Sequence, residues 1–122
     1  MDVIVVGGGG LAREFTDWFA GQVNVLGYGT TDRAEYDAYG MKGYCWDDSV
    51  TPESAGTALA VLAIGRPKIK KRIYESYLSK GFTFPTLVHK TSLVSESAIL
   101  AEGVIVSPGC IVGLGVRLGV AN

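Results

Sequence analysis

The segment that decides the fold runs from Ser92 to Gly119 and reads SLVSESAILAEGVIVSPGCIVGLGVRLG. An aliphatic residue returns at every sixth position without a break: Val94, Leu100, Val106, Val112 and Leu118. Two places before these stand residues of small or medium size: Ser92, Ala98, Val104, Cys110 and Val116. Neither the helical period nor strand alternation produces a six-residue spacing. The segment therefore predicts a parallel β-solenoid in which each hexad forms one short strand and a corner.

In such a solenoid three hexads close one triangular coil, with the aliphatic residue of each hexad pointing inward. Cys110 fits an inward position, so we expect a small core residue there and not a reactive thiol. A solenoid needs several stacked coils and a polar cap at its end. Residues 92–122 provide fewer than two coils and no cap, so we expect the solenoid to be truncated in this chain.

The other end of the chain begins with a β-branched run, Asp2–Val6, which leads directly into Gly7–Gly10. Such a run is typical of a strand buried on both faces of a parallel sheet. The next segment, 11–22, predicts a helix that Gly21 ends. Its apolar residues recur with helical spacing and predict one buried stripe: Leu11, Phe15, Trp18 and Phe19.

A strand, a glycine turn and a helix form the first unit of a nucleotide-binding sheet. The helix N-terminus there offers unpaired N–H groups and a positive dipole end to a phosphate. The spacing of Gly7, Gly9 and Arg13 approximates G-x-G-x-x-G but lacks its last glycine. The alternative is that the glycines serve only a tight turn.

Further along, 23–29 and 58–65 read as two more buried strands. Asp32 follows the first of these strands, at the place where an acid contacts a ribose in Rossmann-like folds; a solvated loop residue is the alternative. A helix then begins at Pro67 and ends near Gly81. Its apolar face is predicted to consist of Ile69, Ile73, Tyr74, Tyr77 and Leu78. The pattern therefore predicts an α/β chain with a Rossmann-like parallel sheet domain over 1–88 and the first coils of a β-helix over 89–122.

Composition excludes several classes of protein. With 11 Lys plus Arg, 12 Asp plus Glu and a net charge of −1, the chain lacks the basic excess of a general nucleic-acid binder. Its two cysteines, Cys45 and Cys110, have no paired spacing and are expected to be reduced thiols. No apolar stretch approaches the length of a membrane span, and the N-terminus lacks the basic region of a signal peptide. We therefore expect a cytoplasmic protein without a metal site.

Two stretches and their order resemble the PglD/NeuD-type sugar acetyltransferases of bacteria. They are VVGGGGLAREFTDWF, from Val5, and VLAIGRPKIKKRIYESYLSKGFTFPTLVHKTSLVSESAILAEGVIVSPGCIVG, from Val61 to Gly113. The resemblance covers nearly the whole chain, with a loose match over 30–52. It implies an N-terminal nucleotide-sugar domain followed by a left-handed β-helix.

The resemblance further implies acetyl transfer from acetyl-CoA to an amino or hydroxyl group of a sugar, typically a UDP-linked amino sugar or a sialic acid. It implies a homotrimer for the full-length protein. The residues that it places against the nucleotide sugar are Gly8, Gly9, Gly10, Asp32, Arg33, Ile64, Gly65 and Arg66. Many relatives have a histidine where this chain has Leu11.

In this family a histidine further along the coils acts as the general base. The single histidine here, His89, matches the entry to the coil and not the base. We therefore expect no catalytic residue within these 122 residues and no activity from them alone. A binding module that holds a nucleotide sugar without catalysis remains the main alternative. A nicotinamide-dependent oxidoreductase domain is disfavoured by the hexads and by the lack of a substrate domain.

Overall fold

The computed structural model describes residues 1–120, which form two compact units, one ending at Thr83 and the other beginning at Phe84. The first unit contains four strands and four helices. The strands are β1 (Asp2–Val6), β2 (Asn24–Gly29), β3 (Tyr44–Trp46) and β4 (Ala60–Leu62). The helices are α1 (Gly10–Trp18), α2 (Arg33–Ala38), α3 (Pro52–Ala55) and α4 (Pro67–Ser79).

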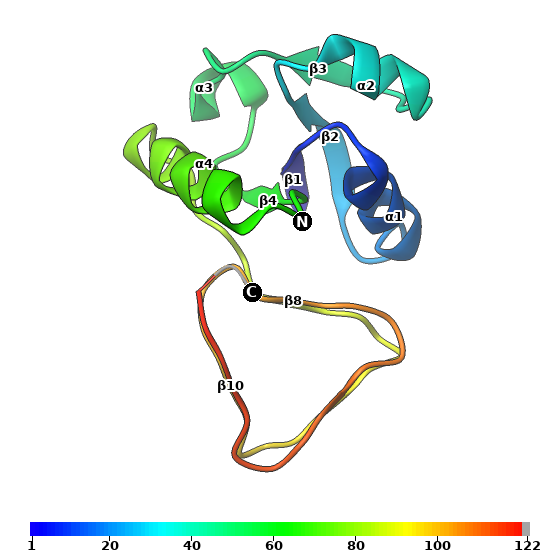
Figure 1. Ribbon diagram of the computed structural model, residues 1–122, viewed down its shortest axis with the longest axis vertical. Coiled ribbons are helices and arrows are strands. Elements are labelled where there is room, and N and C mark those ends of the chain that lie inside the picture. Colours follow the sequence, from blue (N-terminus) through cyan, green and yellow to red (C-terminus); the bar gives the residue numbers. More distant parts are fainter. Residues whose placement is uncertain (121–122) are drawn as a thin grey trace. The chain divides into compact units, whose positions relative to one another are not determined.

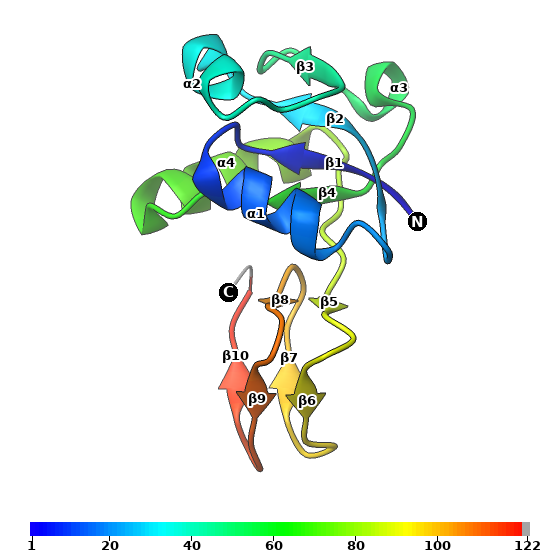
Figure 2. The same cartoon turned by 90° about the vertical axis from the view of Figure 1, so that its right-hand side faces the viewer.

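All four strands are parallel and lie in the order β3-β2-β1-β4. This is the order of the first four strands in the usual dinucleotide-binding sheet. Helices α1 and α4 lie on opposite sides of the sheet (Figures 1 and 2). The sheet is therefore covered on both faces, which explains why β1 is a continuous apolar run: Val3 to Val6 are at most 2% exposed.

The predicted boundaries hold well for α4 and less well for the strand before it. Arg66 occupies the N-cap position of α4 without a side-chain hydrogen bond, Pro67 occupies its first turn, and the chain leaves the helix through Gly81 with φ at +100°. Only glycine adopts such a φ without strain, so Gly81 is a true helix stop. The strand expected over 58–65 is shorter, and β4 ends at Leu62.

The buried stripe predicted for α1 is partly wrong. Leu11 and Trp18 are 44% and 40% exposed, whereas Ala12, Phe15 and Phe19 are buried. The contact face is centred on the small Ala12, which lets the helix approach the sheet closely. On the same face, the Thr16 hydroxyl lies 2.8 Å from the Tyr28 hydroxyl. The apolar pattern identified the correct side of the helix, but the buried face that it predicted is wider than the observed one.

The second unit is built of two-residue strands. They are β5 (Leu87–Val88), β6 (Leu93–Val94), β7 (Ile99–Leu100), β8 (Ile105–Val106), β9 (Ile111–Val112) and β10 (Arg117–Leu118). Parallel pairs join β5 to β8, β6 to β9 and β7 to β10, and paired residues are three hexads apart in the sequence. The resulting coil has a triangular outline (Figure 1). The predicted solenoid of hexads is confirmed, and it begins at β5, within the range 1–88 that the sequence analysis assigned to the first domain.

The aliphatic phase of the hexads and the position two places before it form the core of this unit. Val104, Val106 and Val112 are buried. Partly buried hydrophobic residues pack against them: Val88, Val94, Ala98, Leu100, Ala101 and Leu118. The inward position predicted for Cys110 is wrong, because this thiol is exposed. Within the described residues, an adjacent coil lies on only one side of the coil that contains Cys110. A small side chain at this position is therefore covered from one side only.

Side-chain hydroxyl groups at the corners of one coil form hydrogen bonds with the backbone of the next coil. The Thr91 and Ser97 hydroxyls accept hydrogen bonds from the backbone N–H groups of Gly109 (3.0 Å) and Gly115 (2.9 Å). Both glycines have positive φ, +70° and +68°, which explains their six-residue spacing. These bonds satisfy backbone donors that the two-residue strands leave unpaired. Within residues 1–120 no helix has the length and hydropathy needed to cross a membrane.

Candidate functional site

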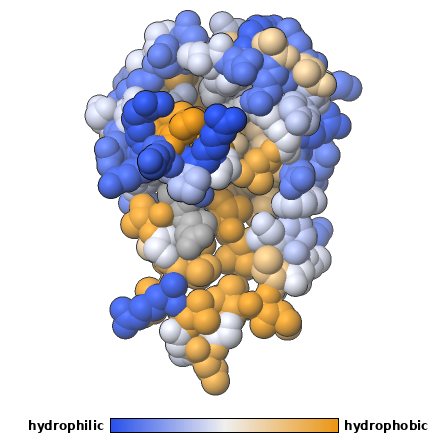
Figure 3. All heavy atoms as spheres, in the orientation of Figure 1, coloured by the Kyte–Doolittle hydropathy of each residue, from blue (hydrophilic) through white to orange (hydrophobic). Residues whose placement is uncertain are grey.

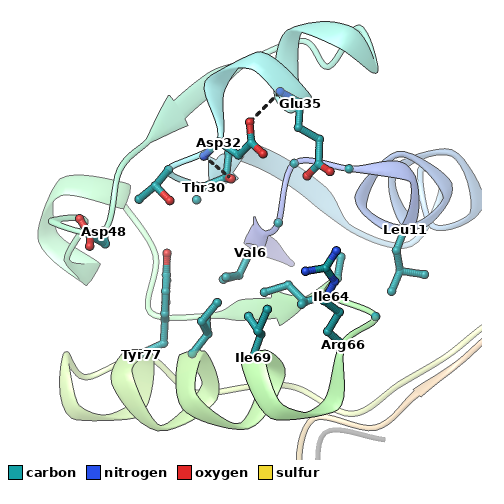
Figure 4. Close-up of a pocket in the computed structure, with 18 of the residues that line it drawn as sticks. Val6, Leu11, Thr30, Asp32, Glu35, Asp48, Ile64, Arg66, Ile69 and Tyr77 are labelled. Atoms are coloured by element: carbon teal, nitrogen blue, oxygen red, sulfur yellow. Dashed lines mark hydrogen bonds between the residues drawn. The ribbon is translucent and has the colours of Figure 1, made fainter.

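A cavity of about 730 Å³ opens at the carboxyl ends of β1, β2 and β4 (Figure 4). Parallel sheets bind ligands at this edge. All but one of the predicted binding residues line it: Gly8, Gly9, Gly10, Asp32, Ile64, Gly65 and Arg66. Segments 7–10 and 63–66, separated by more than fifty residues in the sequence, thus face one space.

Arg33 lies outside this lining. Its guanidinium donates a hydrogen bond of 3.3 Å to the Asp37 carboxylate one helical turn away. The same group lies 5.1 Å from the centre of the Tyr36 ring. Both contacts hold Arg33 on the exposed side of α2.

The glycine turn is shaped by close contacts to its neighbours. Gly7 has φ at +129°, and a Cβ there would lie 2.5 Å from the Ala63 carbonyl oxygen, so the position requires glycine. A Cβ on Gly8 would lie 2.9 Å from the Thr30 methyl carbon. Gly9 is different: its backbone is extended (φ −103°, ψ −157°), which any residue adopts, and a Cβ there would meet only the end of the Glu35 side chain. Gly7 therefore supports the fold, whereas Gly9 keeps the cavity open.

Two helix N-termini contribute to the cavity. Helix α1 begins at Gly10 and α4 at Pro67, and neither has a side-chain cap or an acidic residue in its first turn. The unpaired N–H groups of their first turns, which in α4 start at Lys68 because Pro67 has none, and their positive dipole ends are therefore available to an anion. Arg66, which precedes α4, points into the cavity from the same end (Figure 4). This end of the cavity suits a phosphate or diphosphate.

The two acidic side chains at the glycine-turn end of the cavity, Asp32 and Glu35, have different roles. The Asp32 carboxylate accepts a hydrogen bond of 3.0 Å from the Glu35 backbone N–H and so caps α2. The Glu35 carboxylate instead turns toward the glycine turn (Figure 4), and a Cβ on Gly9 would lie 2.9 Å from its carboxyl carbon. Sequence spacing identified Asp32 and missed Glu35, because helix α2 brings the later acid back toward the turn.

Tyr77 is a second residue that sequence reasoning missed. It was assigned to the apolar face of α4, yet its hydroxyl reaches the cavity (Figure 4). The ring is 5% exposed, and a Cβ on Gly29 would lie 2.5 Å from its hydroxyl oxygen. A glycine inside or at the end of a strand often marks a place where another group approaches the backbone closely. Gly29 is therefore the sequence feature that could have indicated Tyr77. Leu11 also lines the cavity, as an exposed apolar side chain.

His89 lies in the second unit and has a structural environment. The residue is 8% exposed, and its Nδ1 accepts a hydrogen bond of 3.2 Å from the Thr91 backbone N–H. Its own backbone N–H donates to the Val106 carbonyl at 2.9 Å. These bonds hold the imidazole in place at the start of the coil. In the described part of the chain, no three His, Cys, Asp or Glu residues gather as a metal site would require.

Comparison with solved structures identifies proteins of the same architecture. PerB from Caulobacter crescentus, in complex with CoA and GDP-perosamine, is 23% identical with a TM-score of 0.77, over 100% of this chain and 60% of PerB. A mutant of perosamine N-acetyltransferase from the same organism is 21% identical with a TM-score of 0.75, over 99% of this chain and 58% of the mutant. The acetyltransferase domain of PglB from Neisseria gonorrhoeae, in complex with acetyl coenzyme A, is 24% identical with a TM-score of 0.61, over 98% of this chain and 62% of that domain.

The chain has the fold of sugar N-acetyltransferases. It spans about three fifths of the length of these structures. No protein-family model matches it, and comparison with curated proteins gives no match either. The resemblance to sugar acetyltransferases predicted from the glycine turn and the hexads is thus confirmed at the level of the fold.

Proposed function

We propose that this chain is part of an acetyl-CoA-dependent acetyltransferase whose acceptor is a nucleotide-linked amino sugar. The observation that carries the proposal is the cavity at the carboxyl edge of the sheet. There a glycine turn, two uncapped helix N-termini and Arg66 gather in a chain that also contains the hexad coil. The solved relatives of this architecture hold CoA, acetyl coenzyme A or GDP-perosamine.

In this proposal the unit that ends at Thr83 is a Rossmann-like domain for the nucleotide sugar, and the coil that starts at β5 begins a left-handed β-helix. The diphosphate lies against Gly9, Gly10 and Arg66, where N–H groups and a guanidinium provide charge-assisted hydrogen bonds. The ribose hydroxyls donate to the carboxylate of Glu35, which faces the glycine turn. Asp32 acts indirectly, because its carboxylate already caps α2.

Acetyl-CoA would supply an activated acetyl group as a thioester. In the transfer the amine nitrogen of the sugar bonds to the acetyl carbon, the C–S bond breaks, and the amine loses a proton to a general base. The residues described here bind and orient the acceptor, and none of them is assigned as that base.

A thermal-shift panel tests this function. We expect a rise in the melting temperature with one class of nucleotide sugar among UDP-sugars, GDP-sugars, dTDP-sugars and CMP-sialic acid, and no rise with NAD, because ligand binding to the folded state stabilises it. A UDP-sugar is the preference that the sequence resemblance implies, and a GDP-sugar is the ligand of the PerB structure. Stabilisation by NAD alone would favour a dinucleotide-binding module instead.

We also propose that the coils assemble side by side in a homotrimer. Leu93 and Ile111 are register partners on β6 and β9, and they are 68% and 78% exposed. Figure 3 views this unit along the axis of the coil and shows that hydrophobic side chains predominate at that end. Stacked apolar side chains exposed in register are typical of an interface between subunits.

Replacing Ile111 by aspartate is therefore expected to dissociate the assembly to monomers. Burying an aliphatic side chain contributes about 1.5–3 kcal/mol, and the aspartate would place a charge at each copy of the contact. Light scattering after gel filtration measures the mass. The matched control is Leu114→Asp, at a corner outside the paired strands where the side chain is 85% exposed. Equal masses for the two variants would contradict this interface.

A further inference from the structure

The hydroxyl of Tyr77 has no role in holding the protein together. The ring packs against Phe82 with centroids 5.2 Å apart, and the Lys80 ammonium lies 4.7 Å from its centre. Among the described residues, however, its hydroxyl makes no hydrogen bond, although the residue is only 5% exposed. The hydroxyl is not a buried unsatisfied atom, because it opens onto the cavity, where it is free to bind a molecule that enters. Gly29 makes room for it, since any larger residue would collide with the hydroxyl.

The surroundings of Tyr77 keep its hydroxyl protonated. Burial, with a smaller contribution from the nearby carboxylates of Asp48 and Asp47, raises the pKa of Tyr77 to about 12. At neutral pH the group can therefore donate a hydrogen bond, and a carbonyl oxygen of a ligand is a suitable acceptor.

The cavity is electrically asymmetric along its length. Arg66 and the N-termini of α1 and α4 make one end positive, whereas Asp48 lines the other end, beside Tyr77 (Figure 4). The first end therefore suits a diphosphate better than the second, where the Asp48 carboxylate and the Lys80 ammonium beside the Tyr77 ring offset each other. A part of the nucleotide without phosphate charge therefore lies against Tyr77, and among such parts the nucleobase offers a carbonyl fixed next to a ring N–H.

We propose that Tyr77 and Asp48 recognise the lactam edge of a keto nucleobase, an inference that rests on the nucleotide-sugar function proposed above. The Tyr77 hydroxyl donates a hydrogen bond to the base carbonyl, and the Asp48 carboxylate accepts one from the adjacent ring N–H. Guanine, uracil and thymine have this edge. Adenine and cytosine lack it, because neither has a carbonyl beside a protonated ring nitrogen. Tyr77 is thus a specificity-determining residue.

The test compares Tyr77→Phe with the unaltered chain by calorimetric titration of GDP, UDP, ADP, CDP and pyrophosphate. In the unaltered chain GDP or UDP should bind more tightly than ADP and CDP. In Tyr77→Phe the affinity for the preferred keto nucleotide should fall by about 3- to 10-fold, the effect of one lost neutral hydrogen bond. Affinities for ADP, CDP and pyrophosphate should not change. Comparing GDP with UDP identifies the base, since guanine offers Asp48 a second N–H group and uracil does not.

Two further variants keep the test decisive. Asp48→Asn alters an exposed side chain and should reduce the same preference without affecting pyrophosphate. Tyr44→Phe removes the same hydroxyl from a ring that lies outside the cavity lining and is 63% exposed, and it should change nothing. Equal losses for all four nucleotides and pyrophosphate, or no loss in Tyr77→Phe and Asp48→Asn, would overturn the proposal while leaving the nucleotide-sugar function intact. If the folded, unaltered chain bound no nucleotide at all, the proposed function would fail together with this inference.

Discussion

Replacing Gly9 by valine should lower the affinity for a nucleotide sugar by about tenfold or more while leaving the chain folded. The valine side chain would occupy the space beside the α1 N-terminus in which the diphosphate is proposed to lie. Losing charge-assisted hydrogen bonds there costs about 1.5–3 kcal/mol, which corresponds to about 10- to 100-fold in affinity. The extended backbone of Gly9 accepts valine without strain, and only the end of the Glu35 side chain must move.

Calorimetric titration of the folded variant gives the result. Gly113→Val is the matched control, because no atom lies within 4 Å of a Cβ built there and the position lies outside the cavity lining. Both variants should melt near the temperature of the unaltered chain. Undiminished nucleotide-sugar affinity in Gly9→Val would show that the glycine turn does not hold the phosphates.

The 122 residues by themselves should show no acetyl transfer above background. Their one histidine, His89, is buried and uses Nδ1 to accept a backbone hydrogen bond, so it is not poised to take a proton from a substrate amine. The absence of a general base lowers a rate by about 10²- to 10⁴-fold.

Release of the CoA thiol, measured with acetyl-CoA and a panel of amino-sugar nucleotides, checks this expectation. The preparation must bind the nucleotide sugar in the same buffer, so that inactivity is not confused with loss of the acceptor site. Turnover that disappears in His89→Gln would contradict the structural role given to this histidine.

The parts of the fold that could be predicted are those specified by residues close together in the sequence. The hexads repeat at a fixed interval, and the β1 run leads directly into the glycines, so each pattern specifies its geometry without reference to distant residues. The same holds for α4, whose Pro67 and Gly81 mark its two ends.

The residues that were missed depend on tertiary contacts. Tyr77 looks like any other apolar residue of α4 until the folded chain brings its hydroxyl against Gly29. Glu35 reaches the glycine turn only because α2 turns it there. Cys110 illustrates the opposite error: hexad phase gives the position in a coil, but burial depends on what stacks against that coil.

A nuclear magnetic resonance titration of backbone amides shows whether the cavity at the glycine turn binds a nucleotide sugar. Adding the nucleotide sugar selected by the thermal-shift panel should shift the amide signals of Gly8 to Gly10, Thr30, Gly65 and Arg66, which all line the cavity. Signals of the groove beside β3, around Tyr44 and Ser49, should stay in place. Shifts confined to that groove, or no shifts at a saturating concentration of ligand, would contradict a nucleotide-sugar site at the glycine turn.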